Sequence, residues 1–141
     1  MKKILFLFMM VLATVVSARA DKYTIDRDAL PETAQTMLKE YFPKAKVGMI
    51  KVDRHLLKKT DYDVRLVNGT TIEFNNAGKW TSVNCKSREV PEGLIPRAIR
   101  NHVSKNYKDV KIVSIKKKSS GYEIGLSAVS YTHLRAHETG R

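Results

Sequence analysis

The sequence lacks a second cysteine, so no disulfide can form within one chain: Cys85 is the only cysteine among its 141 residues. No internal cross-link can therefore support the fold. Two interpretations of this thiol stay open. Either it forms a disulfide with another chain or acts as a reactive thiol, or it is a small half-buried residue of a strand. We favour the second.

A long hydrophobic run is also absent. The apolar stretch at residues 4–16 is too short to span a bilayer as a helix. It follows two lysines and precedes Ala18-Arg19-Ala20, and this is the pattern of a secretory signal peptide cleaved before Asp21. We therefore expect residues 1–20 to be a signal peptide. The mature protein should be periplasmic or secreted, with no membrane span and, lacking a cysteine at the cleavage site, no lipoprotein anchor.

Catalytic motifs are missing as well. The sequence contains no G-x-S-x-G elbow, no H-E-x-x-H zinc motif and no glycine-rich phosphate loop. His55 falls in a polar hairpin loop, and His102 is expected at the edge of the core, on the apolar side of a helix. Asp61 and Asp63 share one face of a strand, where a weak cation site is conceivable, but a solvated outer face is the favoured interpretation. We expect no enzyme activity, no cofactor and no metal site.

The formal net charge of the full sequence is +12, and it is smaller when the two terminal segments are excluded. The expected signal peptide carries three positive charges and residues 129–141 carry a net one, which leaves +8 on residues 21–128. Nucleic acid is a poor partner for an exported protein. A basic surface of this kind favours another envelope protein or an anionic envelope polymer. A basic surface that serves only solubility is the remaining alternative.

The most informative positive feature is an internal repeat. Residues 30–47, "LPETAQTMLKEYFPKAKV", resemble residues 90–112, and "DYDVRLVNG" at 61–69 resembles "GYEIGLS" at 121–127. Matching Pro31 to Pro91 predicts that the second helix is longer than the first and the second hairpin loop shorter. This second helix is expected to begin with a short turn at Leu94 and Ile95 and to restart at Pro96. The sequence therefore divides into a first repeat at residues 21–87 and a second at residues 88–128.

Each repeat is expected to be a helix followed by an antiparallel β-meander, an α+β fold. The first helix starts at Pro31 and ends before Pro43. Asn68-Gly69 between alternating runs predicts a hairpin with a type I′ turn. Strands are expected at 47–52, 61–67, 70–74 and 79–85 in the first repeat, and at "VKIVSIK" and "GYEIGLS" in the second. The aromatic residues expected to face mostly toward the core are Tyr41, Phe42, Tyr62, Phe74, Trp80, Tyr107 and Tyr122.

The second repeat is incomplete. Where a turn and another strand are expected, the chain continues as "VSYTHLRAHET" at residues 129–139. This stretch matches, residue for residue, one translated reading frame of a transposon-based sequencing-library adaptor. We therefore expect residues 129–141 to be a non-native tail on a C-terminally truncated sequence, and they are excluded from fold reasoning. The metal site suggested by the i, i+4 spacing of His133 and His137 is rejected with the tail.

Together, "YFPKAKV", "YDVRLVNGTTIEFNNAGKWTSVNCK", "VPEGLIPRAI" and "GYEIGLS" resemble the PepSY-like periplasmic proteins, which are also described as resembling beta-lactamase inhibitor protein. The similarity covers about residues 28–127. Asn84 stands where the family usually has aspartate, and His102 where it has an aromatic residue. The resemblance implies tandem helix-plus-antiparallel-sheet units of the PepSY-like or inhibitor-like kind, export to the periplasm, and no known catalysis.

These observations favour an exported, non-catalytic protein-binding module, with an inhibitor or modulator of an envelope enzyme as its specific form. The candidate partner-binding residues lie on the expected outer faces of the sheets and are Arg65, Thr71 and Glu73. The alternative function is binding of an anionic cell-envelope ligand through the basic surface. The sequence names neither the partner nor the oligomeric state.

Overall fold

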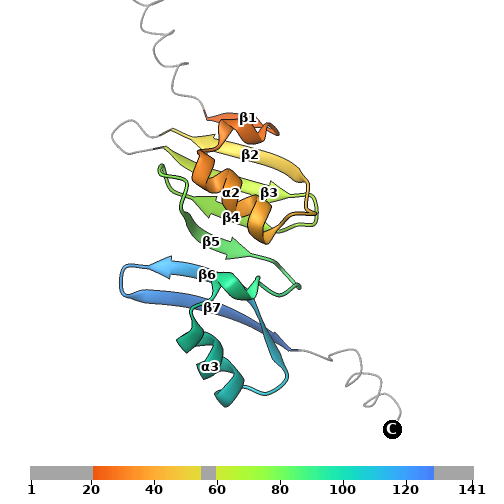
Figure 1. Ribbon diagram of the computed structural model, residues 1–141, viewed down its shortest axis with the longest axis vertical. Helices are drawn as coiled ribbons and strands as arrows, with labels where there is room; N and C mark the ends of the chain where they lie inside the picture. Colours follow the sequence, from red (N-terminus) through yellow and green to blue (C-terminus); the bar gives the residue numbers. More distant parts are fainter. Residues whose placement is uncertain (1–20, 55–59, 129–141) are drawn as a thin grey trace, which may run out of the picture.

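A computed structural model describes residues 21–54 and 60–128. Their strands form one antiparallel sheet in chain order, from β1 at one edge to β7 at the other (Figure 1). The expected signal peptide, the tail at 129–141 and His55 lie outside the described residues. The elements are β1 (Lys22–Thr24), the 3-10 helix η1 (Arg27–Ala29), α2 (Glu32–Tyr41), β2 (Val47–Asp53), β3 (Asp61–Leu66), β4 (Thr71–Phe74), β5 (Trp80–Asn84), the 3-10 helix η2 (Glu92–Leu94), α3 (Arg97–Asn106), β6 (Val110–Lys118) and β7 (Gly121–Ala128).

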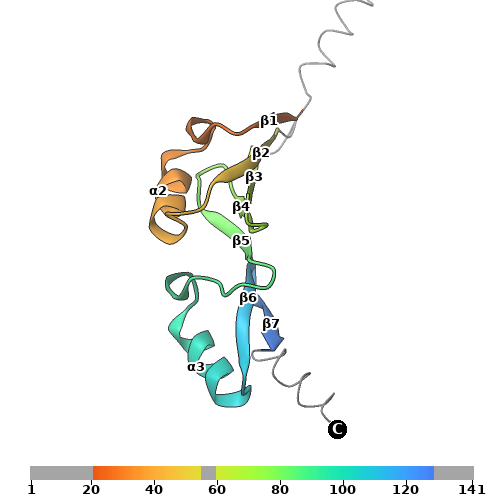
Figure 2. The same cartoon turned by 90° about the vertical axis from the view of Figure 1, so that its right-hand side faces the viewer.

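Both α-helices lie on the same face of this sheet, as the side view in Figure 2 shows. The α+β class with an antiparallel meander is therefore confirmed. The sequence did not predict that the strands of the two repeats join into one sheet. β5 pairs with β6 over only three residue pairs, centred on Val83 and Ile115. Across this junction, the Lys117 Nζ lies 4.0 Å from the centroid of the Trp80 ring, a cation–π contact.

The core lies between α2 and strands β2 to β5. The apolar side of α2 buries Ala34 and Leu38 completely, with Leu30 just before the helix also buried. Along β3 the burial alternates, because successive side chains point to opposite faces of the sheet. The inward residues of the first repeat match the expected ones and include Val64, Leu66, Thr70, Ile72, Phe74 and Val83.

The second helix is covered less well. Val103 is buried and Ile99 packs partly against the core, as expected. His102, however, is exposed and its ring contacts Tyr107 edge-on, so its expected place at the core edge is wrong. Tyr107 and Tyr122 are also exposed instead of facing the core. The reason for this exposure is that, among the described residues, only strands β6 and β7 lie beneath α3 at this end of the sheet.

The hairpin turns differ from the prediction. A type I′ turn requires positive φ at both central residues, but at Asn68-Gly69 only the glycine has positive φ, at 95°. The Gly69 N–H donates to the Leu66 carbonyl at 3.0 Å, and the Leu66 N–H donates to the Thr70 carbonyl at 2.8 Å. This is a three-residue loop whose last residue is left-handed. The turn that ends at Gly78 has the same hydrogen-bond pattern, with Gly78 at a φ of 82°.

The two α-helices occupy equivalent places in the two halves of the chain. Both are ten residues long, and each is preceded by a proline, Pro31 for α2 and Pro96 for α3. The Gln35 side chain donates to the Leu30 carbonyl, and the Arg100 side chain makes the same contact with the Ile95 carbonyl. Pro31 therefore corresponds to Pro96 and not to Pro91. The prediction of a longer second helix is wrong.

The hairpins β2–β3 and β6–β7 also share one register. Val47 pairs with Leu66 and Ile112 with Leu126, and each pair is followed by a bulge in the first strand. Beyond the bulge the pairs correspond down to the loop. The loop of the second hairpin is shorter, as predicted, since only two residues separate β6 from β7.

Gly78 provides a test of how the β4–β5 turn meets α2. A Cβ at Gly78 would lie 2.8 Å from the Pro31 Cβ, whereas a Cβ at Gly69 would have no neighbour nearer than 3.9 Å. Both substitutions to alanine force a left-handed residue, which costs about 1–2 kcal/mol. We expect Gly78→Ala to destabilise the protein by roughly 1–3 kcal/mol more than Gly69→Ala, because of overpacking. Urea unfolding of both variants measures the difference, and equal losses would contradict the close approach.

Candidate functional site

The outer face of the sheet, opposite the helices, carries the side chains that the sequence singled out. Arg65 of β3 and Thr71 of β4 are directly paired, and Glu73 is the next outward residue along β4. All three line one hollow of about 330 Å³, which we call the outer-face hollow. The structure thus brings the three candidate partner-binding residues together. Its full lining is Met49, Lys51, Asp63, Val64, Arg65, Thr71, Ile72, Glu73 and Lys86.

The outer-face hollow has two charged ends. Arg65 and Lys86 supply positive charge at one end, while Asp63 and Glu73 face each other across β3 and β4 at the other. The acidic end continues into a second hollow of about 360 Å³, which adds Asp53 and Asp61. Asp53 and Asp61 are themselves opposite each other in the β2–β3 register. Like charges placed directly opposite each other across strands destabilise a sheet, so the Asp63–Glu73 pair opposes folding.

Lys51 lies among these carboxylates and partly offsets their repulsion. Its Nζ is 3.6 Å from Asp21 Oδ2 and 3.8 Å from Asp53 Oδ2. The carboxylates of Asp53 and Asp21 hold the pKa of the Lys51 ammonium above its usual value. Partial burial and then the Glu73 carboxylate raise the pKa of Asp63, with Lys51 opposing the shift. The negative charge of Asp63 at the acidic end therefore lowers the stability of the folded state.

Chemically, this arrangement can recognise charged groups. Arg65 and Lys86 lie at one end, with the Met49 thioether and the Thr71 hydroxyl in the same row as Arg65, and the carboxylates lie at the other end. A surface of this kind can pair with a protein that carries complementary charges.

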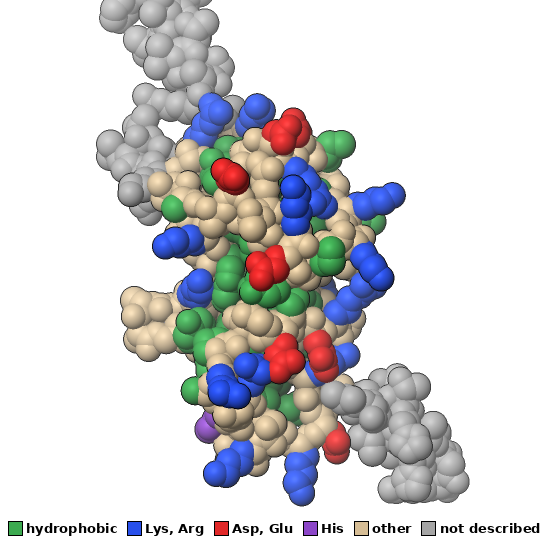
Figure 3. All heavy atoms as spheres, in the orientation of Figure 1, with side chains coloured by type: hydrophobic (Ala, Val, Ile, Leu, Met, Phe, Trp, Pro, Cys, Tyr) green, Lys and Arg blue, Asp and Glu red, His purple; other side chains and the backbone are tan. Residues whose placement is uncertain are grey.

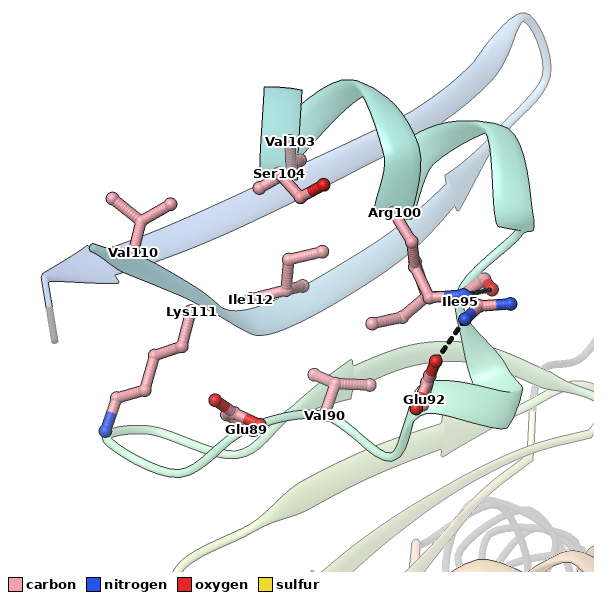
Figure 4. A pocket seen from close by; sticks show the side chains of 10 residues that line it. All are labelled: Glu89, Val90, Glu92, Ile95, Arg100, Val103, Ser104, Val110, Lys111 and Ile112. Carbon is pink, nitrogen blue, oxygen red and sulfur yellow. Dashed lines mark hydrogen bonds and ion pairs between the residues drawn. The ribbon is translucent and has the colours of Figure 1, made fainter. Parts of the chain in front are cut away.

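A separate hollow of about 230 Å³ lies on the helix side, between α3, β6 and the segment before η2 (Figure 4). The side chains of Val90, Ile95, Val103, Val110 and Ile112 line it with apolar groups. At its rim Arg100 donates to Glu92 and to the Ile95 carbonyl. The second helix is covered less than the first, since Tyr107 is exposed whereas its counterpart Phe42 packs against the core.

Cys85 is more deeply buried than expected. It follows β5, is 3% exposed, and its N–H donates to the Val113 carbonyl at 2.8 Å. Burial raises the pKa of its thiol, with the Thr70 side chain opposing the shift through a hydrogen bond. A thiol that is buried and protonated is a poor nucleophile, which disfavours a reactive thiol or a disulfide to another chain.

In the described part of the chain, the remaining polar candidates form no metal-binding group. Among residues 21–54 and 60–128, no three His, Cys, Asp or Glu side chains are arranged to hold a metal ion. His102 Nδ1 lies 3.2 Å from the Asn106 side-chain nitrogen, a local helix contact. Within the same described ranges, no helix is long and apolar enough to cross a membrane.

Sequence reasoning missed three residues of the outer-face hollow. Met49 and Lys51 lie on β2, whose run "VGMIKVD" gave no clear inward and outward faces because a bulge between Val47 and Met49 shifts the alternation. Lys86 follows β5 at a positive φ of 62°. The period-two pattern of β3 identified Arg65, and pairing β2 onto β3 by its apolar residues would have placed Lys51 beside Asp63.

Comparison with known proteins gives one family and several solved structures. A family model described as "Putative beta-lactamase-inhibitor-like, PepSY-like" matches residues 16–59 and 60–140. None of the curated proteins compared with the chain matches it.

Three crystal structures from Bacteroides are similar. A "putative periplasmic protein of unknown function" from Bacteroides vulgatus is 38% identical, with a TM-score of 0.72, covering 76% of this chain and 85% of that one. A second "putative periplasmic protein" from that organism is 41% identical, with a TM-score of 0.71 and coverage of 78% and 85%. A "putative calcium-regulated periplasmic protein" from Bacteroides thetaiotaomicron is 36% identical, with a TM-score of 0.71 and coverage of 76% and 83%.

The raised pKa of Asp63 predicts a pH-dependent stability effect. A carboxyl whose pKa is higher in the folded state favours folding at low pH, and this contribution is lost as the pH rises through the folded pKa. We expect Asp63→Asn to be more stable than the parent protein at pH 7, with the gain disappearing below the unfolded pKa, near pH 3. Urea unfolding at both pH values tests this. An equal gain in stability at both pH values would show that packing, and not charge, causes the stabilisation.

The burial of Cys85 predicts slow alkylation. In the native protein its thiol should react with iodoacetamide at least about a hundredfold more slowly than in 6 M guanidinium chloride, since reaction requires local opening. Mass spectrometry over time measures both rates. Fast native labelling would show that the thiol is accessible.

Proposed function

Because the chain belongs to the PepSY-like, beta-lactamase-inhibitor-like family, we propose that it is an exported, non-catalytic protein-binding module that docks an envelope protein on the outer face of its sheet. An inhibitor or modulator of an envelope enzyme is the specific form of this proposal. The similar structures support an exported location, since all three are described as periplasmic proteins. We further propose that residues 21–87 and 88–128 are two copies of one helix-plus-sheet unit, the second incomplete.

The observation that carries the proposal is the outer-face hollow with its two charged ends. Folding alone does not call for Asp63 opposite Glu73, because a like-charge pair opposes sheet formation. A partner that places a cation against the carboxylates and an anion against Arg65 and Lys86 would relieve both imbalances. Unfavourable electrostatics at a concave surface are typical of functional sites.

Binding of an anionic envelope polymer is the second candidate, supported by the charge of +8 on residues 21–128. Such a ligand needs cations gathered in one region. On the helix-bearing face, most Lys and Arg side chains lie around the outline, and most Asp and Glu side chains lie nearer the middle (Figure 3). On the outer face, the cations of the hollow stand beside Asp63 and Glu73. The charge distribution therefore favours a partner of mixed charge over a uniform polyanion.

The decisive experiment compares charge reversals on and off the outer face. Immobilised protein is used to recover binding partners from envelope extract, and their abundance is quantified for the parent and for the variants Arg65→Glu and Glu73→Lys. We expect each reversal to lower recovery of one stoichiometric partner by about tenfold or more, as for central charged contacts of an interface. Lys105→Glu on the exposed side of α3 is the matched control and should bind as the parent does.

The salt dependence separates the two candidate functions. A protein partner bound through a few specific pairs should remain at moderate ionic strength, whereas a polyanion such as lipopolysaccharide should be released steeply as salt is raised. If the same amount of partner is recovered with the parent and with both outer-face variants, docking on the outer face is ruled out. Salt-labile binding of lipopolysaccharide that responds equally to Lys105→Glu would support the polyanion instead.

A further inference from the structure

The outward side chains of the sheet form two rows of opposite charge that run across the strands. In the first, which we call the acidic row, Asp63 of β3 is directly paired with Glu73 of β4. In the second, which we call the arginine row, Arg65 of β3 is directly paired with Thr71 of β4. Both α-helices lie on the opposite face of the sheet, so neither of them covers the two rows (Figure 2).

The charges of the two rows are not balanced by ion pairs within the described chain. Among the described residues, no ion pair holds Arg65, Lys86 or Glu73, and all three side chains are exposed. Lys51, the cation beside the acidic row, makes its ion pairs with two other carboxylates. The charges of both rows are therefore available to another molecule.

The arrangement of the two rows is complementary to itself. A half-turn about an axis that runs across the strands, midway between the rows, lays the outer face of a second copy on the first with the rows exchanged. Arg65 of each copy then faces Asp63 of the other, with Glu73 beside it. A half-turn about an axis parallel to the strands would instead set the carboxylates of the two copies against each other. Charge therefore favours one relative orientation of two copies.

The same half-turn brings two exposed apolar side chains together at the β1 edge of the sheet. Tyr23 is paired with Lys51, which places it at the level of the acidic row, and it is 58% exposed. Ile25 is two residues further along and 70% exposed, and continuing the β1–β2 register brings it level with the arginine row. Exchange of the rows therefore places Tyr23 of one copy over Ile25 of the other. Aromatic and apolar side chains of this kind are typical of the centre of protein interfaces.

We propose that two copies of this chain associate through their outer faces as a two-fold dimer, in which the arginine row of each copy lies over the acidic row of the other. Face-to-face packing with aligned strands is a usual way for two sheets to pack. The dimer covers the surface proposed above to dock an envelope protein, so such a partner has to displace the second copy. This regulatory role rests on the proposed function, whereas the dimer itself does not.

Sedimentation velocity of the purified full chain at rising concentration tests the dimer. We expect a reversible monomer–dimer equilibrium with a midpoint of about 10–500 µM at low salt, which shifts toward monomer as salt is raised. Arg65→Glu and Asp63→Lys should each weaken dimerisation about tenfold or more, because the two-fold axis repeats every altered contact. Lys105→Glu on the exposed side of α3 is the matched control and should dimerise as the parent does.

An equimolar mixture of Arg65→Glu and Asp63→Lys tests the orientation of the two copies. In the hybrid dimer the introduced glutamate faces the introduced lysine, and the unchanged Arg65 and Asp63 face each other as in the parent. We expect the mixture to dimerise within about threefold of the parent, although each variant alone stays largely monomeric. Circular dichroism verifies that the variants are folded, and Glu73→Lys in place of Asp63→Lys provides a second combination.

Three results would overturn the dimer. They are a parent chain that stays monomeric up to about 1 mM at low salt, a dimer that neither reversal weakens, and folded variants whose mixtures do not recover association. The second result would assign the dimer to another surface of the chain. A monomeric chain that loses an envelope partner on Arg65→Glu would overturn the dimer and support the proposed function, whereas a dimer that recovers no envelope partner would do the reverse.

Discussion

The alternation of apolar and polar side chains along β3, β4 and β5 is the constraint on which the rest of the structure depends. Val64, Ile72 and Val83 lie side by side across these strands, all at most 1% exposed, beneath α2. A slip of one residue in any of these strands would turn its apolar side chains to solvent and its charges into the core. Fixing the core therefore also fixes which charges share the outer face, so the outer-face hollow is a direct product of the packing under α2.

The same constraint acts more weakly in the second half of the chain, and the difference explains the uneven cover there. β5 and β6 meet over three residue pairs, and α3 has only β6 and β7 beneath it among the described residues. α2, by contrast, lies over strands on both of its sides. The thinner cover of α3 goes together with three separate observations, which are the hollow beside α3, the exposed Tyr107 and the exposed Leu126.

Much of this fold was predictable from the sequence, because its signals are local. Alternation identified the strands, Pro31 and Pro43 bounded the first helix, and glycine-containing turns separated the strands. The errors came where local signals compete. Pro91 and Pro96 both suit a helix start, and only the hydrogen bonds of Gln35 and Arg100 show which proline matches Pro31. The type I′ assignment failed because Asn-Gly also fits a three-residue loop in which glycine alone is left-handed.

The site was predictable only in part, because a hollow is a property of neighbouring strands and not of one strand. The pattern of β3 and β4 gave Arg65, Thr71 and Glu73 an outward direction, but Lys51 joins them only through the β2–β3 register. The β3–β4 register sets the carboxylates of Asp63 and Glu73 against each other on the same surface, where a neutral residue at either position would reduce the repulsion. The proposed partner would balance these charges with its own, since binding then recovers free energy that the isolated fold gives up.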